Sequence, residues 1–231
     1  MKTIGLIGGM SWESTLEYYR LINEGVKARL GGYHSAKCLL YSVDFAEIEA
    51  LQRIGDWPRM AQLLGDAAQR LEYGGADFLL LCTNTMHKVA PEMQAAVNIP
   101  LLHIADAAGD AIRAAGLPCV GLLGTRFTME QDFYAGRLER QHGLRVLVPD
   151  EDDRAFVHEV IFDELVLGKI EADSRARYGE IIAGLVERGA QGILLGCTEI
   201  GLLVRPEDSR VPLFDTTQLH ARWAVNQALA A

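Results

Sequence analysis

Two cysteines stand in closely similar surroundings, each at the end of an apolar run and each followed at once by threonine. Cys82 follows the run 79–81, and Cys197 follows the run 193–196. A thiol is only partly ionised near neutral pH, but its thiolate is both basic and nucleophilic. Two thiols on opposite faces of one carbon could remove a proton from one face and return a proton to the other. We therefore interpret Cys82 and Cys197 as paired acid/bases that invert a stereocentre.

The residues beside each cysteine are suited to binding a carboxylate. Hydroxyl, amide and main-chain N–H donors around a bound α-carboxylate would stabilise the negative charge that develops when the α-proton leaves. The candidate donors are Thr83, Asn84 and Thr85 after the first cysteine, Thr198 after the second, and Thr125 in a glycine-containing turn. Such a scheme needs neither a metal nor pyridoxal.

Other side chains near these segments have two interpretations each. His87 could face the first thiol as a charge partner, or it could hydrogen-bond the backbone of its own turn. Glu199 could orient Cys197, or it could be a solvated carboxylate at a helix start. Met10 and Trp12, beside the first glycine turn, are further candidates for substrate contact, although Trp12 could also be a core residue. Cys38 and Cys119 lack polar neighbours of this kind and are expected to pack in the core.

An acidic substrate needs a cation for its side-chain carboxylate. The candidates for this cation are Arg53, Arg126 and Lys169, and no motif selects among them. Gln52 could instead bind a neutral polar side chain. The five remaining histidines are scattered without the helical spacing of metal ligands, so structural or surface roles are expected for them. They are His34, His103, His142, His158 and His220.

The chain resembles two copies of one unit. The segment 5–8 resembles 121–124, 116 residues later, the two cysteines are 115 residues apart, and Pro100 precedes Pro212 by 112 residues. Three landmarks in one order at nearly one spacing predict two βαβ-type units about a pseudo-twofold axis, with the active cleft between them. The boundaries expected are 1–104 plus 212–231 for the first domain and 105–211 for the second.

Composition is consistent with this arrangement. A chain of 231 residues with 49% hydrophobic residues can form two small domains. The net charge of −9 disfavours nucleic acid and anionic membranes as partners, so a small-molecule ligand is expected. No apolar stretch is long enough to span a membrane, and no signal-peptide pattern is present. The four cysteines lie far apart without a C-x-x-C pair, and together these features predict a cytoplasmic protein.

Short apolar runs alternate with longer helical patterns, which is typical of an α/β protein with parallel sheets flanked by helices. Both cysteines would then lie at carboxyl ends of strands, where open α/β sheets bind their ligands. A C-terminal helix over 216–230 is expected to return to the first domain. The predicted strands lie near residues 3–8, 37–43, 77–82, 99–103, 119–124, 144–148, 191–196 and 211–214.

The two cysteine segments resemble the two signatures of the aspartate/glutamate racemase family. The segments are 79–87 and 193–201, and the turn at 8–15 is similar to that of the aspartate racemase branch. The resemblance implies two pseudosymmetric, Rossmann-like domains, cofactor-independent two-base racemisation with Cys82 and Cys197, and frequently a homodimer. It also implies substrate contacts from Asn84, Thr85, Thr125 and Thr198. The glutamate racemase branch has an acidic residue in its first glycine turn and a histidine after its second Cys-Thr, where this chain has Gly8-Gly9-Met10 and Glu199.

These observations predict an amino-acid racemase acting on aspartate or glutamate. The alternatives are a racemase of broad specificity for neutral polar amino acids, or a related hydantoin racemase, maleate isomerase or malonate decarboxylase. A non-catalytic two-domain amino-acid sensor is the alternative outside enzymes.

Overall fold

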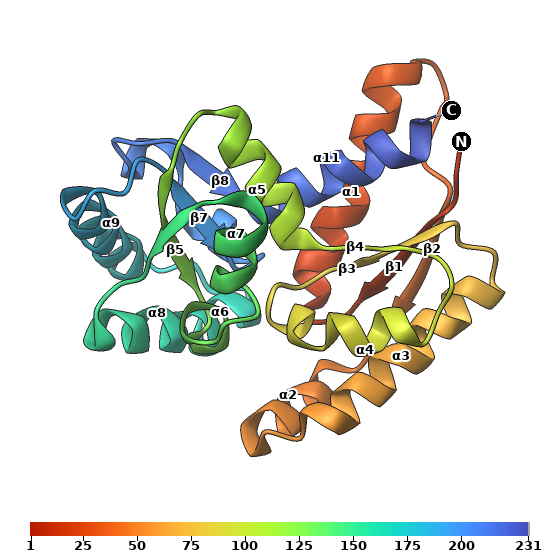
Figure 1. Ribbon diagram of the computed structural model, residues 1–231, viewed down its shortest axis with the longest axis horizontal. Coiled ribbons are helices and arrows are strands. Elements are labelled where there is room, and N and C mark those ends of the chain that lie inside the picture. Colours follow the sequence, from red (N-terminus) through yellow and green to blue (C-terminus); the bar gives the residue numbers. More distant parts are fainter. Residues whose placement is uncertain (231) are drawn as a thin grey trace. The chain divides into compact units, whose positions relative to one another are not determined.

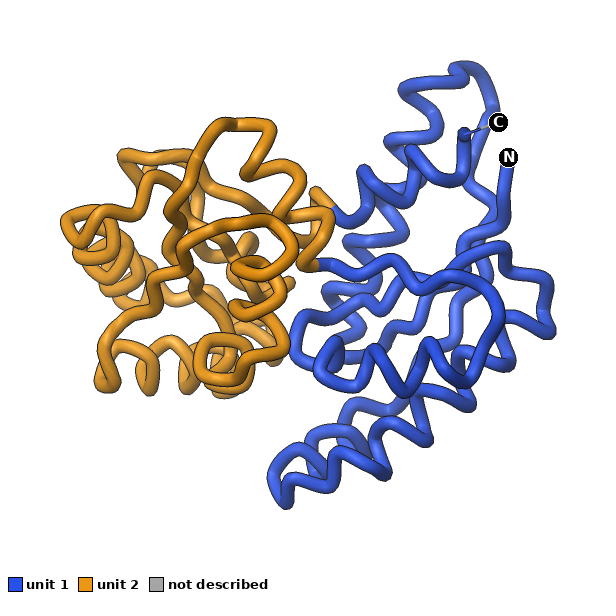
Figure 2. Tube along the Cα trace, viewed as in Figure 1, with its two compact units in different colours: residues 1–104, 220–231 blue, residues 105–219 orange. Residues whose placement is uncertain are grey.

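The computed structural model describes residues 1–230, which divide into two compact units (Figure 2). Unit 1 comprises residues 1–104 and the chain from His220 onward, and unit 2 comprises residues 105–219. The chain therefore leaves unit 1 at the first residue of helix α5 (Ile104–Ala114) and returns within helix α11 (Thr216–Leu229). These two helices are called the crossing helices below.

Unit 1 contains a four-stranded parallel sheet in the order β2-β1-β3-β4 (Figure 1). Its strands are β1 (Ile4–Gly8), β2 (Cys38–Ser42), β3 (Phe78–Leu81) and β4 (Leu101–Leu102). Its helices besides the crossing helices are α1 (Trp12–Leu30), α2 (Phe45–Ile54), α3 (Trp57–Tyr73), the 3₁₀ turn η1 (Thr85–Val89) and α4 (Ala90–Ala95).

The two faces of this sheet bury separate apolar cores because side chains alternate along a strand. Leu79 and Leu81 of β3 pack with residues of α2, α3 and α4, whereas Leu80 packs with residues of α1 and α11. Figure 1 shows α1 and α11 on one side of the sheet and α3 and α4 on the other. The sheet is covered on both faces, as the continuous apolar strands predict.

Unit 2 contains a second four-stranded parallel sheet in the order β6-β5-β7-β8. Its strands are β5 (Cys119–Gly124), β6 (Arg145–Leu147), β7 (Ile193–Gly196) and β8 (Leu213–Asp215). Between them lie α6 (Arg126–Glu130), α7 (Ala135–His142), α8 (Glu151–Asp163), η2 (Leu165–Leu167), α9 (Ala172–Glu187), α10 (Ile200–Leu203) and η3 (Pro206–Asp208).

The α/β class with two parallel sheets is confirmed. Seven of the eight predicted strand segments contain an observed strand, and the eighth, 211–214, overlaps β8 but ends one residue too early. The expected domain limits need a correction, because residues 212–219 were assigned to the first domain. β8 instead pairs with β7 through Leu213 and Ile193, so its backbone hydrogen bonds hold this segment in the second sheet.

The strand register corrects the predicted correspondence between the two cysteines. In unit 1, Ile7 pairs with Leu81, and in unit 2, Leu123 pairs with Leu195. Since the segments 5–8 and 121–124 are matching copies, Leu81 corresponds to Leu195. Thr83 and Cys197 each lie two residues beyond these leucines, so Thr83 corresponds to Cys197. By the same register, Cys82 corresponds to Gly196. The two cysteines are offset by one position in the duplicated unit.

Across residues 1–230, we find no helix that is both long enough and apolar enough to cross a membrane.

Candidate active site

The reactive segments of each unit lie at the carboxyl ends of its two central strands. In unit 1 these ends belong to β1 and β3, and in unit 2 to β5 and β7. Parallel strands bring their carboxyl ends to one edge of a sheet, where ligands of α/β proteins bind. The candidate site is therefore described as two halves, one in each unit.

In unit 2, Cys197 follows β7 directly and hydrogen-bonds a carboxylate. The Cys197 Sγ–H donates to Glu199 Oε2 over 3.0 Å, and the Thr198 hydroxyl donates to the same oxygen over 2.7 Å. Glu199 is only 2% exposed, so the carboxylate is held by donors rather than by bulk water. Of the two interpretations of Glu199, the one as an orienting partner of Cys197 therefore matches the observed contacts.

The surroundings of Cys197 have opposing effects on the pKa of its thiol. Burial raises the pKa of this thiol well above its ordinary value, and the negative charge and hydrogen bond of Glu199 raise it further. The backbone N–H groups of Glu199 and Ile200 hydrogen-bond the sulfur and act to lower the pKa. The thiol thus keeps its proton at rest, and the proton has an acceptor 3.0 Å away.

Tyr178 of α9 is a residue near Cys197 that sequence reasoning missed. It is fully buried, its hydroxyl donates to the Val157 carbonyl over 3.1 Å, and burial followed by the charges of Cys197 and Glu164 raises its pKa. A tyrosine in the apolar stripe of a helix carries no sequence signal for such a position, because the pattern is that of a core residue.

Thr125 has its side chain committed to capping a helix. Its hydroxyl oxygen accepts from the Thr128 N–H over 3.3 Å at the start of α6, and it lies 3.2 Å from the Thr128 hydroxyl. The next residue, Arg126, is exposed and forms no ion pair within the described residues. Lys169 is exposed in the segment after η2, and its N–H donates to the Glu164 carbonyl.

In unit 1, Cys82 is a core residue by its contacts. It is 0% exposed and belongs to the apolar cluster between the sheet and helices α1 and α11, whereas Thr83 and Cys197 are each 8% exposed. Burial, with a smaller contribution from Cys38, raises the pKa of the Cys82 thiol far above its ordinary value. Exposure and register therefore both place Thr83, rather than Cys82, in the position that Cys197 holds in the other unit.

The residues after Thr83 form a compact buried turn. Asn84 and Thr85 are 2% and 5% exposed, and the Asn84 carbonyl accepts from the His87 N–H over 3.1 Å. The ring nitrogens of His87 bond backbone groups: Nδ1 lies 2.7 Å from the Thr83 carbonyl oxygen, and Nε2 accepts from the Ile104 N–H over 3.1 Å. These contacts match the interpretation of His87 as a residue that bonds the backbone of its turn.

Gln52 and the first glycine turn complete this half. Gln52 is buried on α2, its Nε2 lies 3.9 Å from Met86 Sδ, and its Oε1 is buried without a hydrogen-bond partner in the described residues. Gly9 has φ +92°, and a side chain there would collide with the Val43 carbonyl, so only glycine allows this turn. Met10 is a core residue, whereas Trp12 at the start of α1 is 65% exposed.

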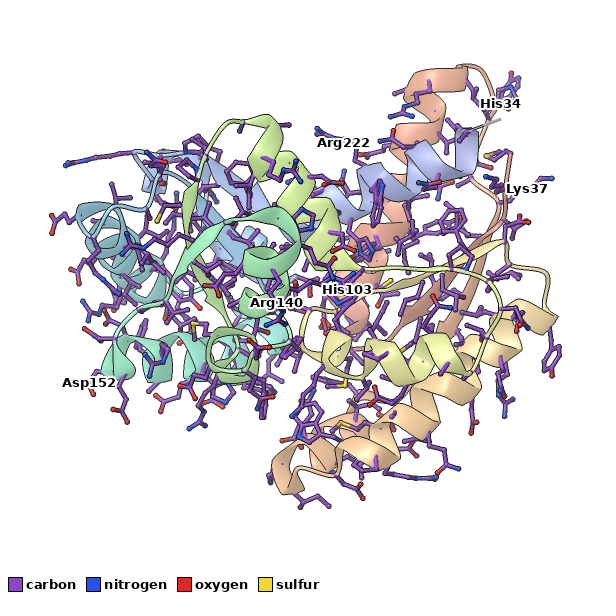
Figure 3. All side chains as sticks on the ribbon, viewed as in Figure 1. His34, Lys37, His103, Arg140, Asp152 and Arg222 are labelled. Atoms are coloured by element: carbon purple, nitrogen blue, oxygen red, sulfur yellow. The ribbon has the colours of Figure 1, made fainter. Side chains whose placement is uncertain are left out.

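Several sequence candidates lie elsewhere. Arg53 is exposed and forms an ion pair with Glu49 on its own helix. His34 lies exposed in the loop before β2, near the amino ends of the strands (Figure 3). Cys38 is half-buried and Cys119 is buried, and all four cysteines are free thiols. Within residues 1–230, no group of three or more His, Cys, Asp or Glu side chains could hold a metal ion.

Comparison with known proteins agrees with this arrangement. The family model described as Asp/Glu/Hydantoin racemase matches residues 7–224. The curated broad specificity amino-acid racemase RacX of Bacillus subtilis is 27% identical over 178 residues, covering 76% of this chain and 75% of RacX. A crystal structure from Yersinia pestis, assigned as an Asp/Glu racemase, is 56% identical with a TM-score of 0.93, and both chains are covered completely.

An aspartate racemase homologue from Pyrococcus horikoshii is 34% identical, with a TM-score of 0.85 and complete coverage of both chains. The family match and these structures extend over almost the whole sequence and both sheets. The chain therefore belongs to the Asp/Glu/hydantoin racemase family.

Proposed function

We propose that this chain is an amino-acid racemase that inverts the α-carbon of aspartate or glutamate by proton transfer, without a bound cofactor. The observation that carries the proposal is the buried Cys197 thiol, 3.0 Å from the Glu199 carboxylate at the end of β7. Removal of an α-proton requires a base. When the adjacent carboxylate takes the thiol proton, the resulting thiolate is that base.

The proton and electron movements balance as follows. The Cys197 proton passes to Glu199, and the thiolate then takes the α-proton of the substrate. The electron pair of the broken C–H bond moves into the α-carboxylate, which becomes an enediolate that a hydroxyl donor such as Thr85 stabilises. A proton carrier from unit 1 then donates a proton to the opposite face of the carbon, which gives the other enantiomer. Glu199 then releases its proton to water and the carrier regains one from water, so both return to their starting states.

Two residues are candidates for the carrier from unit 1. The interpretation of Cys82 and Cys197 as paired acid/bases names Cys82, because a thiol is more acidic than a hydroxyl. The strand register and the exposure of the side chains favour Thr83, since Thr83 occupies the position of Cys197 and Cys82 is enclosed in the apolar core. We propose Thr83 for this role and Cys82 as a packing residue beneath it.

Acidic side-chain specificity rests on two features. The Yersinia relative is assigned as an Asp/Glu racemase, and the Pyrococcus relative is a homologue of aspartate racemase. In this chain, the exposed guanidinium of Arg126 follows the Thr125 cap at the end of β5 and could meet a second carboxylate. RacX and the neutral amide of Gln52 favour the alternative of broad specificity. A homodimer and a cytoplasmic location stay predictions of the resemblance.

The proposed function is tested with a panel of enantiopure amino acids in deuterated buffer, without added cofactor. We expect deuterium at the α-carbon and loss of optical rotation with aspartate or glutamate. We also expect kcat/KM for these substrates to be at least about tenfold above that for asparagine and serine, because a neutral side chain leaves the cation of the site unpaired. Mass spectrometry and circular dichroism report the two changes. Absence of exchange with every amino acid would leave the amino-acid sensor as the better description.

The role of Cys197 is tested by Cys197→Ser. We expect racemisation to fall by about two to four orders of magnitude, because general acid–base groups contribute about that much and a hydroxyl is a far weaker acid than a thiol. Cys38→Ser, which removes a thiol at the amino end of β2 and so away from the carboxyl ends of the strands, is the matched control and should retain activity. Equal activity of the two variants would rule out Cys197 as a proton carrier.

The carrier in unit 1 is identified by comparing Thr83→Val with Cys82→Ala. Valine keeps the shape of threonine without its hydroxyl, so we expect loss of racemisation by about 10²-fold or more. Cys82→Ala removes only a buried sulfur and should retain most activity, with a moderate drop in thermal stability. The reverse pattern, measured by the same exchange assay, would return the role to Cys82.

The coupling of Cys197 to Glu199 predicts a pH effect. Glu199 raises the pKa of Cys197, so Glu199→Gln should lower that pKa and increase the thiolate fraction at neutral pH. We expect the rate of Cys197 alkylation, followed by peptide mass spectrometry, to reach its half-maximum at a lower pH in this variant. Glu180→Gln, on the exposed side of α9, should leave the profile unchanged. An upward shift in Glu199→Gln would contradict the assignment.

A further inference from the structure

His87 hydrogen-bonds two backbone groups from different parts of unit 1. Its Nδ1 lies 2.7 Å from the Thr83 carbonyl oxygen, and its Nε2 lies 3.1 Å from the Ile104 nitrogen. Because the Ile104 N–H can only donate, Nε2 is the acceptor and Nδ1 carries the proton that is donated to Thr83. The side chain is 1% exposed, so bulk water does not compete for either bond. The ring is therefore held in one tautomer and one orientation.

The two backbone groups are significant by their positions. Thr83 is the second residue after β3 and is the proposed proton carrier. Ile104 is the first residue of α5, the crossing helix by which the chain leaves unit 1. His87 thus connects the turn that presents Thr83 to the start of a crossing helix.

Unit 2 has a corresponding connection built from different residues. Thr216 is the first residue of α11, the other crossing helix, and its hydroxyl donates to the Leu195 carbonyl over 2.8 Å. Leu195 lies in β7, two residues before Cys197, which follows the strand. By the strand register the counterpart of His87 is Gly201, and the Asp215 carboxylate occupies the space that a side chain there would need. The connection therefore recurs although the residue types do not.

Two further histidines enclose the His87 ring. The His103 ring, labelled in Figure 3 beside the start of α5, lies 4.5 Å from it between centroids, and the His220 ring lies 5.9 Å from it. His220 is itself fixed, because its Nδ1 lies 2.9 Å from the Tyr18 hydroxyl and its Nε2 lies 2.9 Å from the Leu102 carbonyl oxygen. Rotation of His87 would therefore disturb a packed cluster at both chain crossings.

We propose that His87 is a positioning residue for racemisation, which acts by holding the Thr83 carbonyl and thereby the direction in which the Thr83 side chain leaves β3. This inference rests on the proposed function. His87 need not touch the substrate, since a displacement of about 1 Å in a reacting group is enough to slow a reaction about 10²-fold.

Two conservative variants separate the two hydrogen bonds. In His87→Asn, the amide nitrogen can take the place of Nδ1 and donate to Thr83, whereas the bond to Ile104 is lost. In His87→Gln, the amide oxygen can take the place of Nε2 and accept from Ile104, whereas the bond to Thr83 is lost. We expect His87→Asn to keep kcat within about threefold, and His87→Gln to lower kcat by about tenfold to a hundredfold with KM nearly unchanged.

A structural role alone would not distinguish the variants in this way. Similar melting temperatures with different kcat values support positioning, whereas equal losses of kcat in both variants would overturn it. Amide hydrogen exchange of the segment 83–90 without substrate gives a readout that does not depend on activity, and we expect faster exchange in His87→Gln than in His87→Asn. If the wild-type protein racemises no amino acid, the proposed function fails, and equal amide exchange in the two variants would separately show that His87 does not hold the turn.

Discussion

The position of the chemistry depends on strand register in two parallel sheets. Every strand of a parallel sheet ends at the same edge, so the residue that leaves each central strand is chosen by hydrogen-bond pairing rather than by residue type. In unit 2 that residue is Cys197, and in unit 1 the equivalent residue is Thr83. A shift of one position moves a side chain from one face of the sheet to the other, because successive side chains point to opposite faces.

The surroundings of Cys197 and of Thr83 differ, although the sheets of the two units match. Cys197 has a buried carboxylate 3.0 Å away and backbone N–H groups on its sulfur, an arrangement that can both take up and stabilise charge. The turn at Thr83 has neutral donors instead, and its backbone is fixed through His87. The two sheets thus share one strand order, but one presents a thiol–carboxylate pair and the other a hydroxyl-bearing turn.

The crossing helices join these local features to the rest of the chain. The first residue of each helix is hydrogen-bonded to a segment that bears a reactive residue, through His87 at Ile104 and through the Thr216 hydroxyl at Leu195. Buried polar groups of this kind are costly unless satisfied, so their bonds fix the backbone in one arrangement. The geometry at the strand ends therefore depends on the segments in which the chain passes between the units.

The sequence by itself determined the α/β class, the presence of two similar units, nearly all strand positions and the resemblance to the racemase family, because apolar runs and repeated motifs are local features that survive without coordinates. It could not determine which of Cys82 and Thr83 corresponds to Cys197, because the two residues are adjacent and the correspondence is set by pairing with a neighbouring strand. The assignment of residues 212–219 to the second sheet and the two bonds of His87 were also decided by tertiary structure. Pairing between distant strands and contacts with Ile104 are long-range interactions, and no local pattern encodes them.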